Sequence, residues 1–161
     1  MVALVTNTAP DADGPEAVSA RPRILVADDE AAIRVLLQVN LAFSGFEVIE
    51  AANARDALEQ TTRGDVDLAL LDVMMPDLSG HDVARRLKED PATARVPVVF
   101  LSARASREDL RLGYELGAVD YVTKPFDPIS IGDRIAAALE RVSNGTAEAL
   151  RLERLAELER A

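Results

Sequence analysis

Residues 68–72 form an apolar run, Leu-Ala-Leu-Leu, that ends in a carboxylate, Asp72. Such a run is typical of a strand buried on both faces, as in a parallel sheet. Proline, aspartate, serine and glycine follow within residues 76–80, and these residue types favour a turn. Because open α/β sheets bind ligands outside the carboxyl ends of their strands, Asp72 is predicted to face a binding crevice. The alternative for this run alone is a strand end with an ordinary solvated aspartate.

Further apolar runs alternate along the chain with segments whose apolar residues recur at helical spacing. Strands are predicted at residues 23–27, 47–51, 68–72, 98–101 and 120–123, and helices at 31–43, 54–62, 82–89, 107–116 and 128–142. This alternation predicts a five-stranded parallel sheet, covered by helices on both faces and connected by right-handed crossovers. The predicted fold class is therefore α/β, a doubly wound (βα)5 domain with a C-terminal helical extension.

The two ends of the chain differ in composition from this domain, which is predicted over residues 23–142. Residues 1–22 hold three prolines and several acids without any helical or strand period, and they are predicted to be a disordered leader. Residues 143–161 begin with a Ser-Asn-Gly break and are predicted to be a helical tail or linker. The tail's apolar stripe, at positions 149, 152, 155, 156 and 158, has no predicted core to join. We therefore expect it to need a partner chain or a longer coiled coil.

The composition excludes several classes of site and partner. The net charge of −10 argues against direct binding of nucleic acid, because phosphate contacts need clustered lysine and arginine. The absence of cysteine excludes disulfides and thiolate metal sites, and a single histidine excludes a histidine-rich metal site. No apolar run approaches the roughly 20 residues of a membrane span, and the first residues do not resemble a signal peptide. A cytoplasmic protein without a membrane partner is expected.

Polar side chains follow four of the predicted strands at the point where each strand ends. They are Asp28, Asp29, Asp72, Ser102 and Lys124. The carboxyl ends of parallel strands meet at one edge of the sheet, so these side chains are predicted to lie together. Three close carboxylates repel unless a cation or proton intervenes, and an all-oxygen donor set favours Mg²⁺ or Mn²⁺. An aspartate beside such a cation and a lysine can act as a nucleophile towards phosphorus.

The stretches around these residues resemble the receiver domain of two-component response regulators. The matching sequences are ILVADDE at 24–30, LLDVMMPDLSG at 70–80, VFLSAR at 99–104 and GAVDYVTKPF at 117–126. The resemblance covers residues 23–142 and implies the flavodoxin-like receiver fold. Met74 and Arg104 flank the site as they do in receivers of winged-helix transcription factors, which this chain resembles most.

The resemblance implies a phosphoryl acceptor and a magnesium site. Asp72 would accept a phosphoryl group from a phosphohistidine on a sensor histidine kinase or a phosphotransfer protein. The cofactor would be Mg²⁺, held by Asp29 and Asp72, by the backbone carbonyl of Met74, and by Asp28 through water. Such a domain would catalyse only its own phosphoryl transfer and a slow autodephosphorylation, and would otherwise not be an enzyme.

The resemblance also implies a switch. Lys124 would pair with the phosphoryl group, Ser102 would turn towards it, and Tyr121 would then swing inward. These movements would change the surface of the fourth helix, fifth strand and fifth helix, within residues 107–142. That surface, or the C-terminal helix, is the expected site of partner binding or homodimerisation. Charged positions that resemble the dimer face of the same subfamily are Glu108, Arg111, Asp120 and Arg134.

Two other functions are compatible with these residues. The first is an interaction module that dimerises without being phosphorylated. The second is a Mg²⁺-dependent phosphohydrolase with an aspartyl nucleophile. The second is disfavoured because such hydrolases usually have another acid two residues after the nucleophile, where this chain has Met74.

Overall fold

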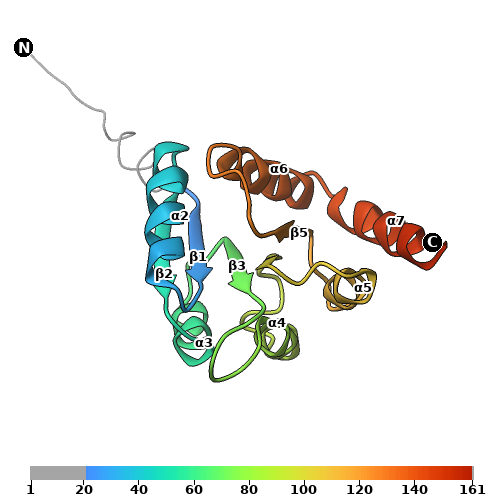
Figure 1. Ribbon diagram of the computed structural model, residues 1–161, viewed down its shortest axis with the longest axis horizontal. Coiled ribbons are helices and arrows are strands. Elements are labelled where there is room, and N and C mark those ends of the chain that lie inside the picture. The colour runs from blue at the N-terminus through green and yellow to red at the C-terminus, as the bar shows by residue number, and fades with distance from the viewer. Residues whose placement is uncertain (1–20, 161) are drawn as a thin grey trace, which may run out of the picture.

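The computed structural model describes residues 21–160 and shows one sheet between two layers of helices (Figure 1). The strands are β1 (Arg23–Ala27), β2 (Glu47–Ala51), β3 (Leu68–Asp72), β4 (Val98–Ser102) and β5 (Asp120–Thr123). They pair in parallel in the order β2-β1-β3-β4-β5. The predicted doubly wound α/β fold is confirmed. The predicted leader, apart from residues 21 and 22, lies outside the described residues.

The helices divide between the two faces of the sheet. They are α2 (Ala31–Phe43), α3 (Ala54–Thr62), α4 (Gly80–Glu89), α5 (Arg107–Glu115), α6 (Ile131–Ser143) and α7 (Ala147–Arg160). Helices α2 and α6 bury side chains in one core cluster, and α3, α4 and α5 bury theirs in the cluster on the opposite face (Figure 1). Between Arg21 and Arg160, no helix combines the length and the apolar character that crossing a membrane requires.

The central strands explain why the sequence shows unbroken apolar runs. Every residue of β3 and of β4 is buried. Successive side chains of a strand point to opposite faces, so Leu68 and Leu70 enter one core cluster while Ala69 and Leu71 enter the other. With helices on both faces, neither side of these strands meets solvent, and the two-residue alternation of a half-exposed strand disappears.

Two helices begin at residues other than those predicted, because local hydrogen bonds set their first turns. Helix α4 begins at Gly80 rather than residue 82, since Ser79 and Asp82 form a reciprocal capping box. Helix α6 begins at Ile131 rather than residue 128. The carboxylate of Asp127 accepts the N–H of Ile129 at 3.0 Å, which holds residues 127–130 in a turn.

The C-terminal helix α7 packs against the domain, which differs from the prediction. Leu155 and Leu158 pack against the core cluster beneath α5, so the premise that no core remained for this helix is wrong. Leu152, part of the predicted stripe, is 52% exposed. The packed face also includes Arg151 and Arg154. Hydrophobic periodicity places arginine on the solvent side of a helix, but the aliphatic stem of an arginine can cover apolar surface.

Candidate functional site

Three carboxylates converge at the carboxyl edge of the sheet, between the neighbouring strands β1 and β3. Asp28 and Asp29 directly follow β1, and Asp72 is the last residue of β3. One oxygen of each carboxylate lies within 4.8 Å of an oxygen of the other two. Asp28 and Asp72 are buried, whereas Asp29 is exposed. Two of the three carboxylates are therefore enclosed by the protein, and the cluster is open to solvent at Asp29.

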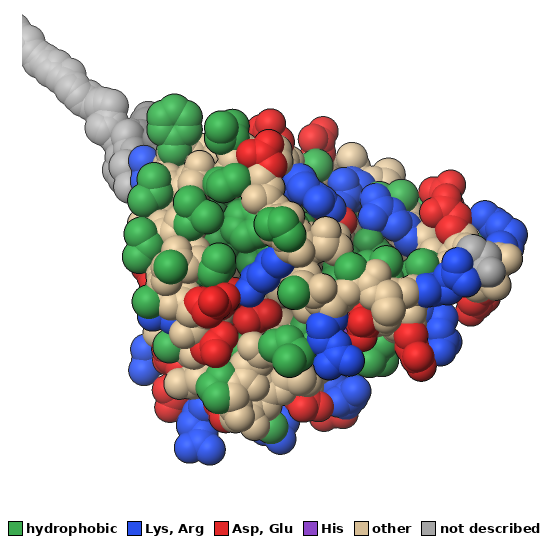
Figure 2. Space-filling view, viewed as in Figure 1, with side chains coloured by type: hydrophobic (Ala, Val, Ile, Leu, Met, Phe, Trp, Pro, Cys, Tyr) green, Lys and Arg blue, Asp and Glu red, His purple; other side chains and the backbone are tan. Residues whose placement is uncertain are grey.

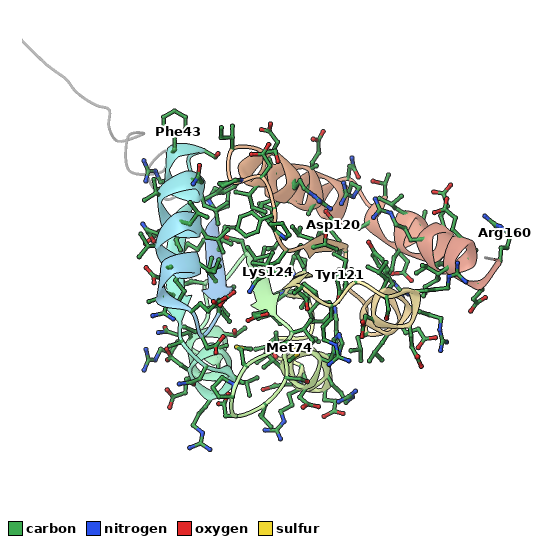
Figure 3. All side chains as sticks on the ribbon, viewed as in Figure 1. Phe43, Met74, Asp120, Tyr121, Lys124 and Arg160 are labelled. Carbon is green, nitrogen blue, oxygen red and sulfur yellow. The ribbon has the colours of Figure 1, made fainter. Side chains whose placement is uncertain are left out.

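Lys124, which follows β5, reaches into this cluster (Figure 3). Its Nζ lies 2.9 Å from an oxygen of Asp28 and 3.6 Å from an oxygen of Asp72. Burial alone would lower the pKa of Lys124, but its hydrogen bond to Asp28 and the charge of Asp72 raise that pKa above its usual value. The ammonium is therefore charged at neutral pH. In Figure 2, acidic and basic side chains meet at this place near the middle of the view.

The electrostatics of Asp72 favour binding of a proton or a cation. Burial, followed by the charge of Asp28, raises the pKa of Asp72 from 3.8 to about 6. The charge of Lys124 and the backbone N–H of Met74, which donates to Asp72 Oδ1 at 3.2 Å, oppose this rise. Because these two contacts do not cancel the cost of burial and repulsion, a further positive charge at the cluster would stabilise the ionised carboxylate.

The donor set fits Mg²⁺. All the candidate ligands are oxygens, which this cation prefers, and two opposite ligands of Mg²⁺ lie about 4.2 Å apart. The mutual distances of up to 4.8 Å between the carboxylate oxygens are close to that span. The exposed side at Asp29 leaves room for the waters that Mg²⁺ usually retains. The assignment of Asp28, Asp29, Asp72 and the Met74 carbonyl as ligands stays a prediction.

Ser102 and Tyr121 lie on the neighbouring strands β4 and β5, and both hydrogen-bond to the backbone of Arg104. Ser102 ends β4 and is fully buried, and its Oγ accepts the backbone N–H of Arg104 at 2.9 Å. Tyr121 lies on β5, is only 5% exposed, and donates its hydroxyl to the carbonyl of Arg104. Tyr121 was expected to swing inward only after Ser102 moved, and the structure shows it in the inward position. Gly113 on α5 leaves the space, since a Cβ there would lie 3.0 Å from the Tyr121 ring.

The other predicted residues around the site are placed as follows. Arg104 lies beside Met74, with its guanidinium Nη1 3.7 Å from the Met74 sulfur. Met74, labelled in Figure 3, is also the residue whose N–H donates to Asp72. The Lys124–Pro125 peptide bond is cis.

Three of the four charged residues of the predicted dimer face, Arg111, Asp120 and Arg134, form ion pairs within the chain. Arg134 donates to Asp120 at 2.9 Å, and Arg111 donates to Glu115 at 2.8 Å. These contacts leave the predicted homodimer untested.

Gly80 is a residue of the site whose role the sequence did not reveal. Its N–H donates to the carbonyl of Val73 at 2.9 Å, which brings the start of α4 against the end of β3. A Cβ on Gly80 would lie 2.3 Å from the carbonyl oxygen of Asp72. In the sequence, Ser79-Gly80 was interpreted only as a turn, and nothing in the residue types indicates that backbone contact.

Comparisons with known proteins agree with this geometry. The family model of the response regulator receiver domain matches residues 24–136. The phosphate regulon transcriptional regulatory protein PhoB of Pseudomonas aeruginosa is 42% identical over 126 residues, which are 78% of this chain and 55% of that protein. The alkaline phosphatase synthesis transcriptional regulatory protein PhoP of Bacillus subtilis is 43% identical over 119 residues, 74% of this chain and 49% of that protein.

A solved structure shows the same fold. The CheY-like response regulator receiver domain protein from Methanospirillum hungatei JF-1 superposes with a TM-score of 0.73 at 27% identity, over 78% of this chain and 99% of that one. The chain spans about half the length of the curated relatives it matches. The family match over residues 24–136, the identities above 40% and the shared fold together show that this chain belongs to the response regulator receiver domain family of two-component systems.

Proposed function

We propose that residues 23–142 form a phosphorylation-controlled receiver unit and that Asp72 is its phosphoryl acceptor. The donor is a phosphohistidine on a sensor histidine kinase or a phosphotransfer protein. The observation that carries this proposal is the convergence of Asp28, Asp29, Asp72 and Lys124 at one edge of the sheet. Both curated relatives are named as transcriptional regulators, which supports control of transcription as the output of the whole protein.

In the proposed reaction, a carboxylate oxygen of Asp72 attacks the phosphorus atom, and the bond between phosphorus and the histidine nitrogen breaks. The nitrogen keeps the electron pair, and the imidazole leaves as a neutral ring because its other nitrogen carries a proton. Lys124, whose Nζ lies 3.6 Å from an oxygen of Asp72, would pair with a phosphoryl oxygen. Mg²⁺ held by Asp28, Asp29 and Asp72 would neutralise charge on the phosphoryl oxygens. The Met74 N–H donates to Oδ1 of Asp72 and helps to orient the carboxylate.

We propose that phosphorylation changes the protein surface through the backbone of Arg104, which contacts both Ser102 and Tyr121. An aspartyl phosphate adds a charge of about −1.5 to −2 at Asp72, and Ser102, on the neighbouring strand β4, is the predicted hydroxyl donor to it. Turning that hydroxyl towards the phosphoryl group would alter its contact with the Arg104 N–H, and the carbonyl of the same residue holds the Tyr121 hydroxyl. A movement at Ser102 is thereby transmitted to the face formed by α5, β5 and α6, where a partner or a second copy would bind. The phosphoryl group shifts the populations of two packings by favouring one of them.

Incubation with acetyl phosphate and Mg²⁺, followed by intact mass measurement, tests the acceptor. The wild-type chain is expected to gain one phosphoryl group, and Asp72→Asn is expected to gain none because its amide is not a nucleophile. Asp77→Asn is the matched control, since Asp77 lies exposed in the same loop and should leave acceptance intact. Equal labelling of wild type and Asp72→Asn would exclude Asp72 as the acceptor. Turnover of small phosphate esters would favour the phosphohydrolase instead.

Replacement of Lys124 tests its two proposed roles separately. Lys124→Met is expected to bind Mg²⁺ about fivefold more tightly, because removing an ammonium beside two carboxylates strengthens cation binding by about 1 kcal/mol at an intermediate dielectric. Its rate of phosphorylation by acetyl phosphate is expected to fall by at least about tenfold, since one stabilising charge on the phosphoryl oxygens is lost. Isothermal titration calorimetry and time-resolved mass measurement give the two values.

Arg95→Met is the control for this experiment, because it removes one positive charge from an exposed residue away from the site. Weaker Mg²⁺ binding by Lys124→Met than by Arg95→Met would show that Lys124 does not compete with a cation for these carboxylates.

A further inference from the structure

Helix α7 covers part of the face formed by α5, β5 and α6, which we call the α5–β5–α6 face (Figure 1). This helix lies beyond residues 24–136, the segment that matches the receiver family. Its half-buried positions recur at the spacing of a single helical face. They are Ala147, Leu150, Arg151, Arg154, Leu155, Ala156 and Leu158.

Two arginines of α7 anchor the helix to residues of this face. Arg151 donates to the backbone carbonyl of Tyr114 at 2.6 Å. Arg154 donates to the Tyr114 hydroxyl at 2.8 Å and lies 3.5 Å from Asp120. Asp120 is the carboxylate that also pairs with Arg134. The arginines of α7 therefore occupy hydrogen-bonding groups of Tyr114 and Asp120 that a partner bound to the same face would otherwise contact.

The apolar part of α7 closes the face next to the switch residue. Leu155 and Leu158 pack against the core cluster that contains Tyr114 and Tyr121. A pocket of about 340 Å³ remains between α7 and the face, with Tyr121 in its wall. Its other lining residues include Leu110, Thr123 and Leu158. A second molecule cannot reach this part of the face while α7 lies on it.

The attachment of α7 is suited to reversible release. No residue of the helix is fully buried, so its undocking exposes little apolar surface compared with the opening of a core helix. Gly145, at φ +81°, lies in the short connection between α6 and α7, where only a few dihedral angles need to change.

We propose that α7 is an intramolecular competitor of a second copy of this chain for the α5–β5–α6 face. Docked, the helix holds the chain in a monomeric state. Released, it exposes Tyr114, Asp120 and the surroundings of Tyr121. The face carries acidic and basic groups, including Asp120 and Arg134, so two copies related by a two-fold axis could exchange opposite charges across it. This inference rests on the proposed function only in taking that face as the output surface.

The test compares two neutral double substitutions on opposite sides of α7. Leu155→Gln with Leu158→Gln removes the apolar contacts of the docked face, and Ala149→Gln with Leu152→Gln changes two exposed positions. Glutamine keeps a helix propensity close to that of leucine. Self-association is measured by sedimentation equilibrium without any phosphoryl donor. Dimerisation requires two chains with α7 released. The chain with Leu155→Gln and Leu158→Gln, the undocked variant, is therefore expected to associate at least about tenfold more tightly than the control with Ala149→Gln and Leu152→Gln.

A second pair of variants tests the polar anchor. Arg154→Gln removes the hydrogen bond to Tyr114, and Arg160→Gln makes the same charge change at an exposed residue at the far end of α7 (Figure 3). Because the chain has no cysteine, spin labels at single introduced cysteines in place of Glu108 and Glu153 report the distance between α5 and α7. The distribution of this distance is expected to become broad in the two undocked variants, which are Arg154→Gln and the double variant at 155 and 158. It is expected to stay narrow in the two control variants.

The outcomes separate this inference from the proposed phosphorylation. Tighter association of the undocked variants supports competition by α7 even if Asp72 proves not to accept a phosphoryl group. Equal association constants in undocked variants and controls, with the spin labels showing released helices, would overturn the competition while leaving phosphorylation at Asp72 intact. A narrow spin-label distance in both undocked variants would also overturn it, because the named contacts would then not hold the helix.

Discussion

Asp72→Asn is expected to raise the free energy of unfolding above about pH 7, without divalent cations, by about 3 kcal/mol. Asp72 is 3% exposed, and its burial and the charge of Asp28 raise its pKa from 3.8 to about 6. Each unit of pKa difference between the folded and unfolded states corresponds to about 1.4 kcal/mol. The asparagine side chain carries no charge, so the folded variant avoids that cost. A residue placed for chemistry thus destabilises the fold that holds it.

The sign of this effect gives it a characteristic dependence on pH. The folded wild-type chain binds the Asp72 proton more tightly than the unfolded chain does, so wild-type stability falls as pH rises from about 4 to about 6. Above about pH 6 the ionised Asp72 carboxylate destabilises the folded state to its full extent, and below about pH 4 this destabilisation is absent. The difference between variant and wild type is therefore expected to be largest at neutral pH and to vanish on acidification. Urea unfolding followed by circular dichroism over this range measures it.

Asp77→Asn is a control with the opposite sign. Burial acts to raise the pKa of Asp77, but the backbone N–H groups of Ala54 and Arg55, which donate to it at 3.0 Å, lower it overall. Its charged form therefore stabilises the folded state, and its replacement is expected to lower stability at neutral pH. If Asp72→Asn were no more stable than wild type at neutral pH, the carboxylate cluster would not carry the repulsion inferred from its geometry.

Magnesium should reduce the difference between Asp72→Asn and wild type. A ligand that binds only the folded state stabilises it by about 2.7 kcal/mol when its concentration is about one hundred times its dissociation constant. We expect added Mg²⁺ to raise the unfolding free energy of the wild-type chain and to act much less on the variant, which lacks one carboxylate of the cluster. The same titration without any phosphoryl donor therefore tests the proposed metal site on its own.

The strands were more predictable than the helix ends. The predicted bounds of β1, β2, β3 and β5 agree with the structure. The buried strand β3 is a continuous apolar run, as expected between two helical layers, and the edge strand β2 mixes apolar and acidic residues, as a partly exposed strand does. The starts of α4 and α6 depend instead on local hydrogen bonds, which hydrophobic periodicity does not detect. The Ser79 hydroxyl accepts the N–H of Asp82, and the Asp127 carboxylate accepts the N–H of Ile129. The packed face of α7 was predicted only in part for a related reason: Leu155 and Leu158 lie on it as predicted, but Arg151 and Arg154 also contact the domain, through their guanidinium groups.

The members of the site could be predicted, but their individual contacts could not. A parallel sheet brings its strand ends to one edge, so the approach of Asp28, Asp72 and Lys124 follows from the order of strands and helices. Which carboxylate accepts the closest hydrogen bond from Lys124 depends on differences below 1 Å, at 2.9 Å for Asp28 and 3.6 Å for Asp72. Such differences are set by packing of the whole core.

Gly80→Ala is expected to lower the free energy of unfolding by about 3 kcal/mol. The new methyl group would lie 2.3 Å from the carbonyl oxygen of Asp72 and 3.0 Å from its carbonyl carbon. Both are backbone atoms of a buried strand, which cannot turn aside as a side chain can. The gain from replacing glycine in a helix, about 0.5–1 kcal/mol, offsets only part of this cost. Urea unfolding measures the stability, and calorimetry measures the affinity for Mg²⁺.

Gly113→Ala is the graded comparison for this prediction. Its methyl group would meet the rings of Tyr121 at 3.0 Å and Phe100 at 3.2 Å, which are side chains that can adjust. We expect a smaller loss of stability, about 1 kcal/mol, and unchanged affinity for Mg²⁺. For Gly80→Ala, relief of the clash must displace the end of β3 or the start of α4, so the affinity for Mg²⁺ should fall together with stability. A Gly80→Ala chain as stable as wild type would mean that the α4 loop yields freely, and that the backbone contact at Gly80 does not position Asp72.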